Sequence, residues 1–169
     1  MTIATTSRLL IQPFDTSDAP FILELLNEPA WLRFIGDKQV RSIDDAINYI
    51  HNVPLKSYRD NGFGLWKVTL KETLEPIGMC GLIRREALQH EDIGFAFLAA
   101  HNGKGYAQEA ATAVIDYARE QLQFKQLLAI ANEDNGRSIR LLEKLGFAYQ
   151  RHITMPGDQT PLVLMGRRL

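Results

Sequence analysis

A glycine-rich segment at residues 101–110, HNGKGYAQEA, has the composition of an anion-binding loop. Gly103 and Gly105 allow the backbone to turn sharply and to approach a ligand without an intervening Cβ. If a helix begins here, the amides of residues 103–108 point outward at its N-terminus, where unpaired N–H groups and the helix dipole favour negative charge. A pyrophosphate would suit such a site. By spacing alone, an ordinary glycine-rich turn before a helix explains these residues equally well.

Two well-known nucleotide signatures do not fit this segment. The P-loop pattern GxxxxGK[ST] is absent, because Tyr106 follows Gly105. The dinucleotide fingerprint has a third glycine, which this segment lacks. The fingerprint also follows a buried parallel strand, whereas this segment follows an amphipathic strand and lies late in the chain. A nucleotide-binding domain of another class remains an alternative.

A second group of polar residues lies at the start of a later helix. Asn135 is placed to cap that helix, and Ser138 lies about one turn inside it. One interpretation is an N-cap with an incidental serine. The other places both side chains at the mouth of a cleft between strands at 93–98 and 127–131.

The elements that must position these motifs follow from hydrophobic periodicity. Alternating apolar residues predict a first strand at 8–14 and an antiparallel meander at 63–70, 77–83 and 93–97. Helical spacing predicts early helices after residue 15, from Pro29 and from Ser42, with Pro54 ending or bending the last. Later helices are expected at 107–118 and 138–145, and a final strand pair at 147–154 and 160–168.

The apolar run at 127–131 predicts a strand buried on both faces. Because a helix connects it to the meander, its pairing with the strand at 93–97 is expected to be parallel. The result is an α/β chain of the α+β type, with one domain over residues 1–169.

Composition limits the functional classes. Nineteen basic and twenty acidic residues give a net charge of -1, which provides no basic field for nucleic acid or an anionic membrane. No signal peptide or membrane span is evident, so a cytoplasmic protein is expected. A single cysteine, Cys80, excludes an internal disulfide, and a buried structural thiol is favoured over a nucleophile there. The four histidines lack metal-ligand spacing, so no metal is expected.

Taken together, the two motifs resemble the GNAT superfamily of N-acetyltransferases. The family loop pattern (Arg/Gln)-x-x-Gly-x-(Gly/Ala) matches residues 102–107, with Asn102 in place of Arg or Gln. GKGYAQEA, the string from Asn135 to Phe147 and the early segment RLLIQPF are similar to the branch that contains the ribosomal-protein N-terminal acetyltransferases. The likeness covers nearly the whole chain.

The resemblance implies a mixed, mostly antiparallel sheet whose fourth and fifth strands splay apart, flanked by helices. It implies that acetyl-CoA is the cosubstrate, that the backbone of Phe97 and Leu98 pairs with pantetheine, and that Asn135 contacts the pantetheine region. The residues that it implies for the pyrophosphate are Gly103, Lys104, Gly105, Tyr106, Ala107 and Gln108. Arg137, Arg140 or Lys144 could meet the 3′-phosphate, but a solvated helix face is favoured for them.

The resemblance also suggests catalytic groups. Many family members use a tyrosine as the acid, but Leu142 stands at that position, which leaves Ser138 as the candidate. Asp92 fits the base, with Glu91 as its neighbour, although an exposed charge at a strand edge is the favoured alternative. Trp31, Phe34, Tyr49 and Trp66 could shape the acceptor pocket, or could belong to the core.

The leading hypothesis is therefore acetyl transfer to a primary amine of a small molecule or peptide, such as a protein N-terminus. The alternative is a non-catalytic module of the same fold that binds CoA as a sensor. The sequence identifies neither the acceptor nor the general base, and both a monomer and a homodimer remain open.

Overall fold

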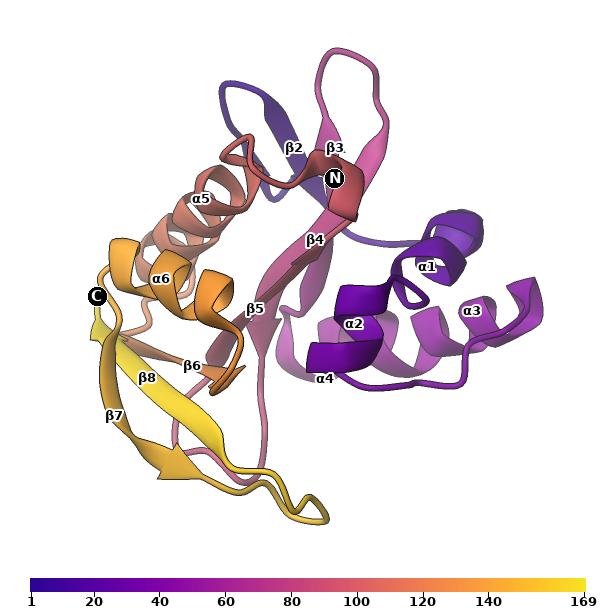
Figure 1. Ribbon diagram of the computed structural model, residues 1–169. Helices are drawn as coiled ribbons and strands as arrows, with labels where there is room; N and C mark the ends of the chain where they lie inside the picture. Colours follow the sequence, from indigo (N-terminus) through magenta and orange to yellow (C-terminus); the bar gives the residue numbers. More distant parts are fainter.

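The computed structural model describes all residues from 1 to 169 and is built on one eight-stranded sheet (Figure 1). The strand order is β1-β2-β3-β4-β5-β6-β8-β7, and every neighbouring pair is antiparallel except β5 with β6. The strands are β1 (Ala4–Thr5), β2 (Leu9–Gln12), β3 (Leu65–Leu70), β4 (Pro76–Ile83), β5 (Asp92–Phe97), β6 (Gln126–Asn132), β7 (Ala148–Ile153) and β8 (Leu162–Arg168).

Helices cover both faces of this sheet. The α-helices are α1 (Ala19–Leu25), α2 (Pro29–Phe34), α3 (Ile43–Ile50), α4 (Lys56–Asn61), α5 (Tyr106–Glu120) and α6 (Gly136–Lys144). The shorter turns are η1 (Thr16–Asp18), η2 (His51–Leu55) and η3 (Ala99–His101). In Figure 1, α5 and α6 lie on one side of the central strands and α1 to α4 on the other.

Alternation along the central strands divides the apolar residues between two clusters. Ile93 on β5 belongs to the larger cluster, which contains the apolar residues of α5, and Phe95 and Phe97 pack against it. Leu98 belongs to the smaller cluster with residues of α1 to α3, and Ala96 packs there. Successive residues of a strand point to opposite faces, so β5 separates an α5–α6 side from an α1–α4 side.

The predicted meander, the parallel β5–β6 pairing and the final strand pair are confirmed. Two features of the sheet were missed: the two-residue β1, and the insertion of β8 between β6 and β7. Pro54 does not stop the helical path, because it lies in the π-helical turn η2 between α3 and α4. A π turn accommodates a residue that lacks the backbone N–H needed for a regular helical hydrogen bond.

Candidate functional site

The candidate site begins where β5 and β6 separate. The two strands register only at Asp92 with Leu128, where the Leu128 N–H donates to the Glu91 carbonyl at 2.9 Å. Beyond this point the strands form a V whose arms are Ile93–Phe97 and the rest of β6. Because parallel strands end at the same edge of a sheet, the segments after β5 and β6 both lie at the open end of the V.

The edge of β5 that faces the gap can be assigned from its hydrogen bonds. The Leu98 N–H donates to the Ile77 carbonyl at 2.9 Å, and the Leu98 carbonyl accepts from the His101 N–H at 3.0 Å. Since backbone groups alternate along a strand, the N–H and carbonyl of Phe97 point away from β4 and into the gap. The Leu98 N–H and carbonyl already have partners within the protein, so of the two residues expected to pair with pantetheine it is Phe97 whose backbone groups face the gap. The pairing itself stays a prediction.

The glycine-rich loop follows directly after β5 and η3. Gly103 and Gly105 adopt φ of +79° and +82°, the left-handed region that favours glycine, and Gly105 is the N-cap of α5. None of the six backbone N–H groups from 103 to 108 donates a hydrogen bond to any protein group. The loop thus presents a set of unpaired donors and the positive end of a fifteen-residue helix.

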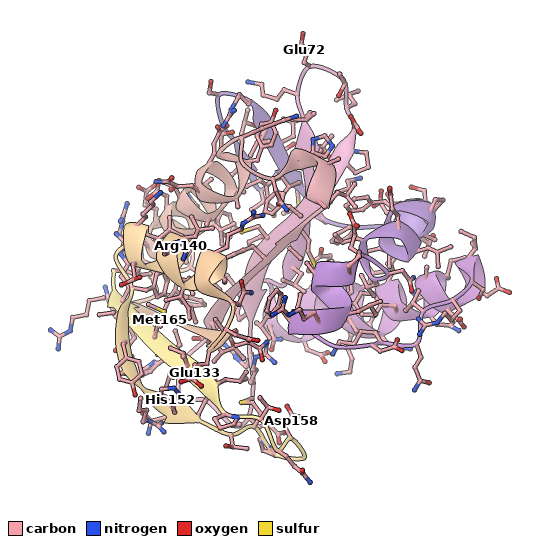
Figure 2. The ribbon with its side chains drawn as sticks, viewed as in Figure 1. Glu72, Glu133, Arg140, His152, Asp158 and Met165 are labelled. Atoms are coloured by element: carbon pink, nitrogen blue, oxygen red, sulfur yellow. The ribbon has the colours of Figure 1, made fainter.

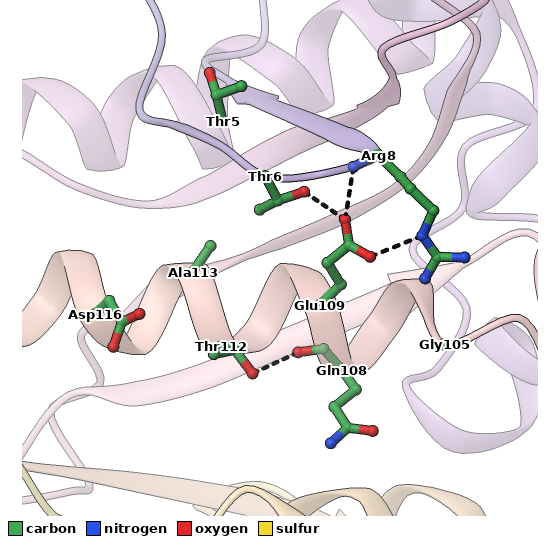
Figure 3. Close-up of a pocket in the computed structure, with 9 residues that line it drawn as sticks. All are labelled: Thr5, Thr6, Arg8, Gly105, Gln108, Glu109, Thr112, Ala113 and Asp116. Atoms are coloured by element: carbon green, nitrogen blue, oxygen red, sulfur yellow. Dashed lines mark hydrogen bonds and ion pairs between the residues drawn. The ribbon is translucent and has the colours of Figure 1, made fainter.

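Arg8 holds this loop from the other end of the chain (Figure 3). Its Nη1 donates to the Lys104 carbonyl at 2.9 Å, and its guanidinium lies 4.4 Å from the centre of the Tyr106 ring. Its Nε pairs with Glu109 Oε1 at 2.8 Å, and its backbone N–H donates to Glu109 Oε2 at 2.9 Å. Thr6 donates to the same carboxylate. Arg8 and Glu109 were missed as loop-supporting residues, because nothing in the sequence brings these distant segments together.

Burial pushes the pKa of Glu109 upward, but hydrogen bonds from Thr6 and Arg8 outweigh it and lower the pKa below its ordinary value. Glu109 is therefore ionised, and its ion pair with Arg8 offsets the repulsion that its charge would exert on an anion at the loop. A hollow beside the start of α5 is lined by these residues together with Thr5, Gln108 and Thr112 (Figure 3).

The second motif lies at the end of the other arm. Asn135 is the N-cap of α6, and its side-chain oxygen accepts from the Ser138 N–H at 3.3 Å, as predicted. The Ser138 side chain is half-buried, and its hydroxyl has no hydrogen-bond partner in the protein. Leu142 is buried in the core, 1 % exposed, so this position does not reach the cleft. Arg137, Arg140 and Lys144 are exposed on α6, as Figure 2 shows for Arg140.

Asp92 is located at the closed end of the V and is 1 % exposed. The favoured alternative of an exposed strand-edge charge is wrong for this residue. Its Oδ1 accepts from Arg85 Nε at 3.0 Å. Burial raises the pKa of Asp92 to about 6, and the neighbouring Arg85 opposes that shift. Such a carboxyl is poised to exchange a proton near neutral pH.

Several weaker candidates prove to be core residues. Cys80 is completely buried in β4, and burial raises the pKa of its thiol, which makes it a structural residue. Trp66 packs edge-on against Tyr117 at 5.3 Å between ring centres, inside the larger cluster. Trp31 belongs to the smaller cluster on the α1–α4 side, and the partly buried Tyr49 packs against that cluster. No three His, Cys, Asp or Glu side chains are grouped so that they could hold a metal ion.

None of the helices is both long and apolar enough to cross a lipid bilayer.

Known proteins resemble this chain over most of its length. The family model described as acetyltransferase (GNAT) domain matches residues 8–148. The protein YkkB of Bacillus subtilis (strain 168) is 31% identical over 152 residues, covering 88% of this chain and 86% of the relative. The N-acetyltransferase YoaA of the same organism is 29% identical over 147 residues, covering 86% and 82%.

Solved structures show the same fold. An acetyltransferase from Agrobacterium tumefaciens str. C58 superposes with a TM-score of 0.82 at 22% identity, covering 98% of this chain and 94% of that one. RimL, a ribosomal L7/L12 α-N-protein acetyltransferase solved in complex with coenzyme A, superposes with a TM-score of 0.82 at 16% identity, covering 100% and 98%. The chain belongs to the GNAT family of acetyltransferases.

Proposed function

We propose that this enzyme transfers the acetyl group of acetyl-CoA to a primary amine, by direct attack while both substrates occupy the V between β5 and β6. The α-amine of a peptide or protein is included in the proposed acceptor class. The observation that carries the proposal is the row of six unpaired amides at 103–108, placed at the open end of the V. These donors match the oxygens of a pyrophosphate.

The position proposed for the pyrophosphate also sets a path for the pantetheine arm of the cosubstrate. A chain that leaves the loop and enters the V runs along the gap-facing edge of β5, where Phe97 offers an N–H and a carbonyl for strand-like pairing. A backbone N–H on this edge is also available to the oxyanion of the tetrahedral intermediate. We assign Asn135 and Ser138 to the same space, because α6 begins shortly after the end of β6.

The chemistry assigns complementary roles to the two candidate catalytic groups. The acceptor arrives as an ammonium ion and loses one proton before its nitrogen can attack the acetyl carbon. A second proton leaves the nitrogen as the carbon–sulfur bond breaks to release the thiolate. We assign the first proton to Asp92, through water, because its carboxylate is buried at the closed end of the V. We assign protonation of the thiolate to the free hydroxyl of Ser138.

Ligand-induced stabilisation tests the cosubstrate. Acetyl-CoA and CoA should raise the melting temperature, whereas ATP and NAD at the same concentration should not, because only a ligand that binds the folded state stabilises it. An equal shift with ATP or NAD would contradict the assignment. Release of free thiol in the presence of peptides, polyamines and aminoglycosides then tests catalysis. CoA binding without thiol release from any amine would favour the sensor alternative.

A further inference from the structure

The short helix α2 and the residue before it are fastened to both arms of the V. Glu28 Oε1 accepts from the Ala99 N–H at 2.9 Å, just beyond the end of β5. At the other end of α2, the Phe34 carbonyl accepts from the Asn132 side chain at the end of β6. Arg33 also pairs with Asp134 at 3.3 Å. The segment therefore connects the ends of β5 and β6, and Figure 1 shows α2 on the same side of the central strands as α1, α3 and α4.

Glu28 is a carboxylate without a counter-ion. No Lys, Arg or His nitrogen lies within ion-pair distance of it, and it makes no side-chain capping bond to its own helix. Its side chain is half-buried, and its one hydrogen-bond donor is the Ala99 N–H. An ionised carboxylate has about four acceptor positions, so most of its capacity is unused. A half-buried carboxylate in this condition attracts a cation more strongly than an exposed one.

The position of Glu28 relates it to the reaction. Ala99 is two residues after Phe97, which corresponds to about 7 Å of extended chain. The Glu28 carboxylate thus lies beside the proposed pantetheine path. It also lies on the face of β5 where the Ala96 and Leu98 side chains pack, opposite to α5 and α6. A molecule that reaches the proposed pantetheine path from the α1–α4 side meets this carboxylate close to Ala99.

We propose that Glu28 is an acceptor-binding residue that selects amines carrying a positive charge. This inference rests on the proposed function and narrows its acceptor class. Alkylamines have a pKa near 10 and enter as ammonium ions, whereas acylated amines are neutral and gain nothing from the carboxylate. The Ala99 N–H fixes one oxygen of Glu28 and leaves the other to receive the ammonium N–H groups.

The test uses two substitutions that separate charge from structure. Glu28→Gln keeps an oxygen for the Ala99 N–H and removes the charge, whereas Glu28→Ala removes both. Glu24→Gln is the matched control, because Glu24 is exposed on α1, has no ion pair and loses the same charge. Spermidine, kanamycin and a hexapeptide with a free N-terminus are titrated calorimetrically into the CoA-bound protein, and the N-acetylated hexapeptide serves as the neutral probe.

We expect at least one cationic probe to bind, and Glu28→Gln to weaken that binding by about tenfold or more, the loss of one charge-assisted hydrogen bond. The melting temperature and the Kd for CoA should remain those of the parent, and Glu24→Gln should change nothing. Unchanged cation binding in Glu28→Gln, or no binding of any cationic probe to the CoA-bound parent, would overturn the inference. Failure to bind CoA in the same titrations would instead refute the proposed function.

Discussion

At the scale of single residues, the two candidate catalytic side chains, Ser138 and Asp92, differ in their burial and in their hydrogen-bond partners within the protein. The Ser138 hydroxyl has no partner within the protein, while its backbone N–H is held by the Asn135 cap. The Asp92 carboxylate is buried and bound by Arg85. A hydroxyl without a partner is free to act as a proton donor, and a carboxyl of raised pKa suits a proton acceptor near neutral pH.

Replacement of Ser138 by alanine should lower kcat by about 10²-fold, the usual contribution of a positioned acid. The Kd for acetyl-CoA should stay within about twofold, because the loop amides and the Asn135 cap are unaffected. Steady-state kinetics and calorimetry on the same preparation measure both quantities. A normal kcat would remove the serine from the mechanism.

The raised pKa of Asp92 predicts how activity depends on pH. If Asp92 accepts the proton, kcat/KM should rise as pH increases through about 6 and then level off until the amine itself titrates. Asp92→Asn should lower kcat/KM by about 10²-fold and abolish this inflection. Glu91→Gln should retain it, since Glu91 is the partner of Arg84 at the strand edge. An inflection that persists in Asp92→Asn would assign the base elsewhere.

The raised pKa of Asp92 also predicts that the free energy of unfolding falls as the pH rises. Because the folded protein holds the Asp92 proton more tightly than the unfolded chain, its contribution to stability is complete below the unfolded value of 3.8 and is lost as pH rises through about 6. Asp92→Asn should therefore reduce the decline of the free energy of unfolding between these pH values, as measured by urea titration.

At the scale of elements, the loop depends on backbone conformations that only glycine adopts readily. Gly105 has φ of +82°, and a Cβ there would lie 3.4 Å from Arg8 Nη2. The residue lies within the row of unpaired amides and is the N-cap of α5, so a side chain there affects both the backbone and the space beside the amides.

Gly105→Val should raise the Kd for CoA by about tenfold or more, because left-handed backbone costs an L-residue about 1–2 kcal/mol before any contact with the phosphates is counted. Gly157→Val is the matched control: its φ is +86°, nothing lies within 4 Å of its would-be Cβ, and it is in the turn between β7 and β8. Equal affinity for CoA in the two variants would contradict the loop assignment.

At the scale of the whole molecule, the loop is stabilised by a residue from the opposite end of the chain. Arg8 is 96 residues before Lys104 and 101 residues before Glu109, yet it contacts both. The sheet makes this possible, because α5 contacts β1 and β2 as well as β4 and β5, and Arg8 directly precedes β2. The proposed phosphate site is thus supported by tertiary contacts as well as by its own glycines.

Arg8→Ala should weaken CoA binding by about tenfold, through loss of the charge-assisted bond to the Lys104 carbonyl and of a cation beside the loop. Arg8→Lys should recover only part of the affinity, because an ammonium cannot reproduce the guanidinium fork and its stacking on Tyr106. Arg119→Ala, which removes a surface pair with Asp116 near the far end of the same helix, should bind CoA normally. Calorimetric titration with CoA provides the comparison, and parental affinity in Arg8→Ala would exclude a role for the tether.

The sequence alone determined the local features: the meander, the parallel strand pair, the left-handed glycines, the Asn135 cap and the buried Cys80 follow from periodicity, side-chain chemistry and backbone sterics, which act over a few residues. The tertiary structure decided which surfaces meet. It placed β8 beside β6, buried Asp92 against Arg85, engaged Leu98 with Ile77 and brought Arg8 and Glu28 to the two edges of the cleft. These contacts join segments whose spacing carries no periodic signal, because partners far apart in the chain are chosen by packing of the whole sheet and its helices.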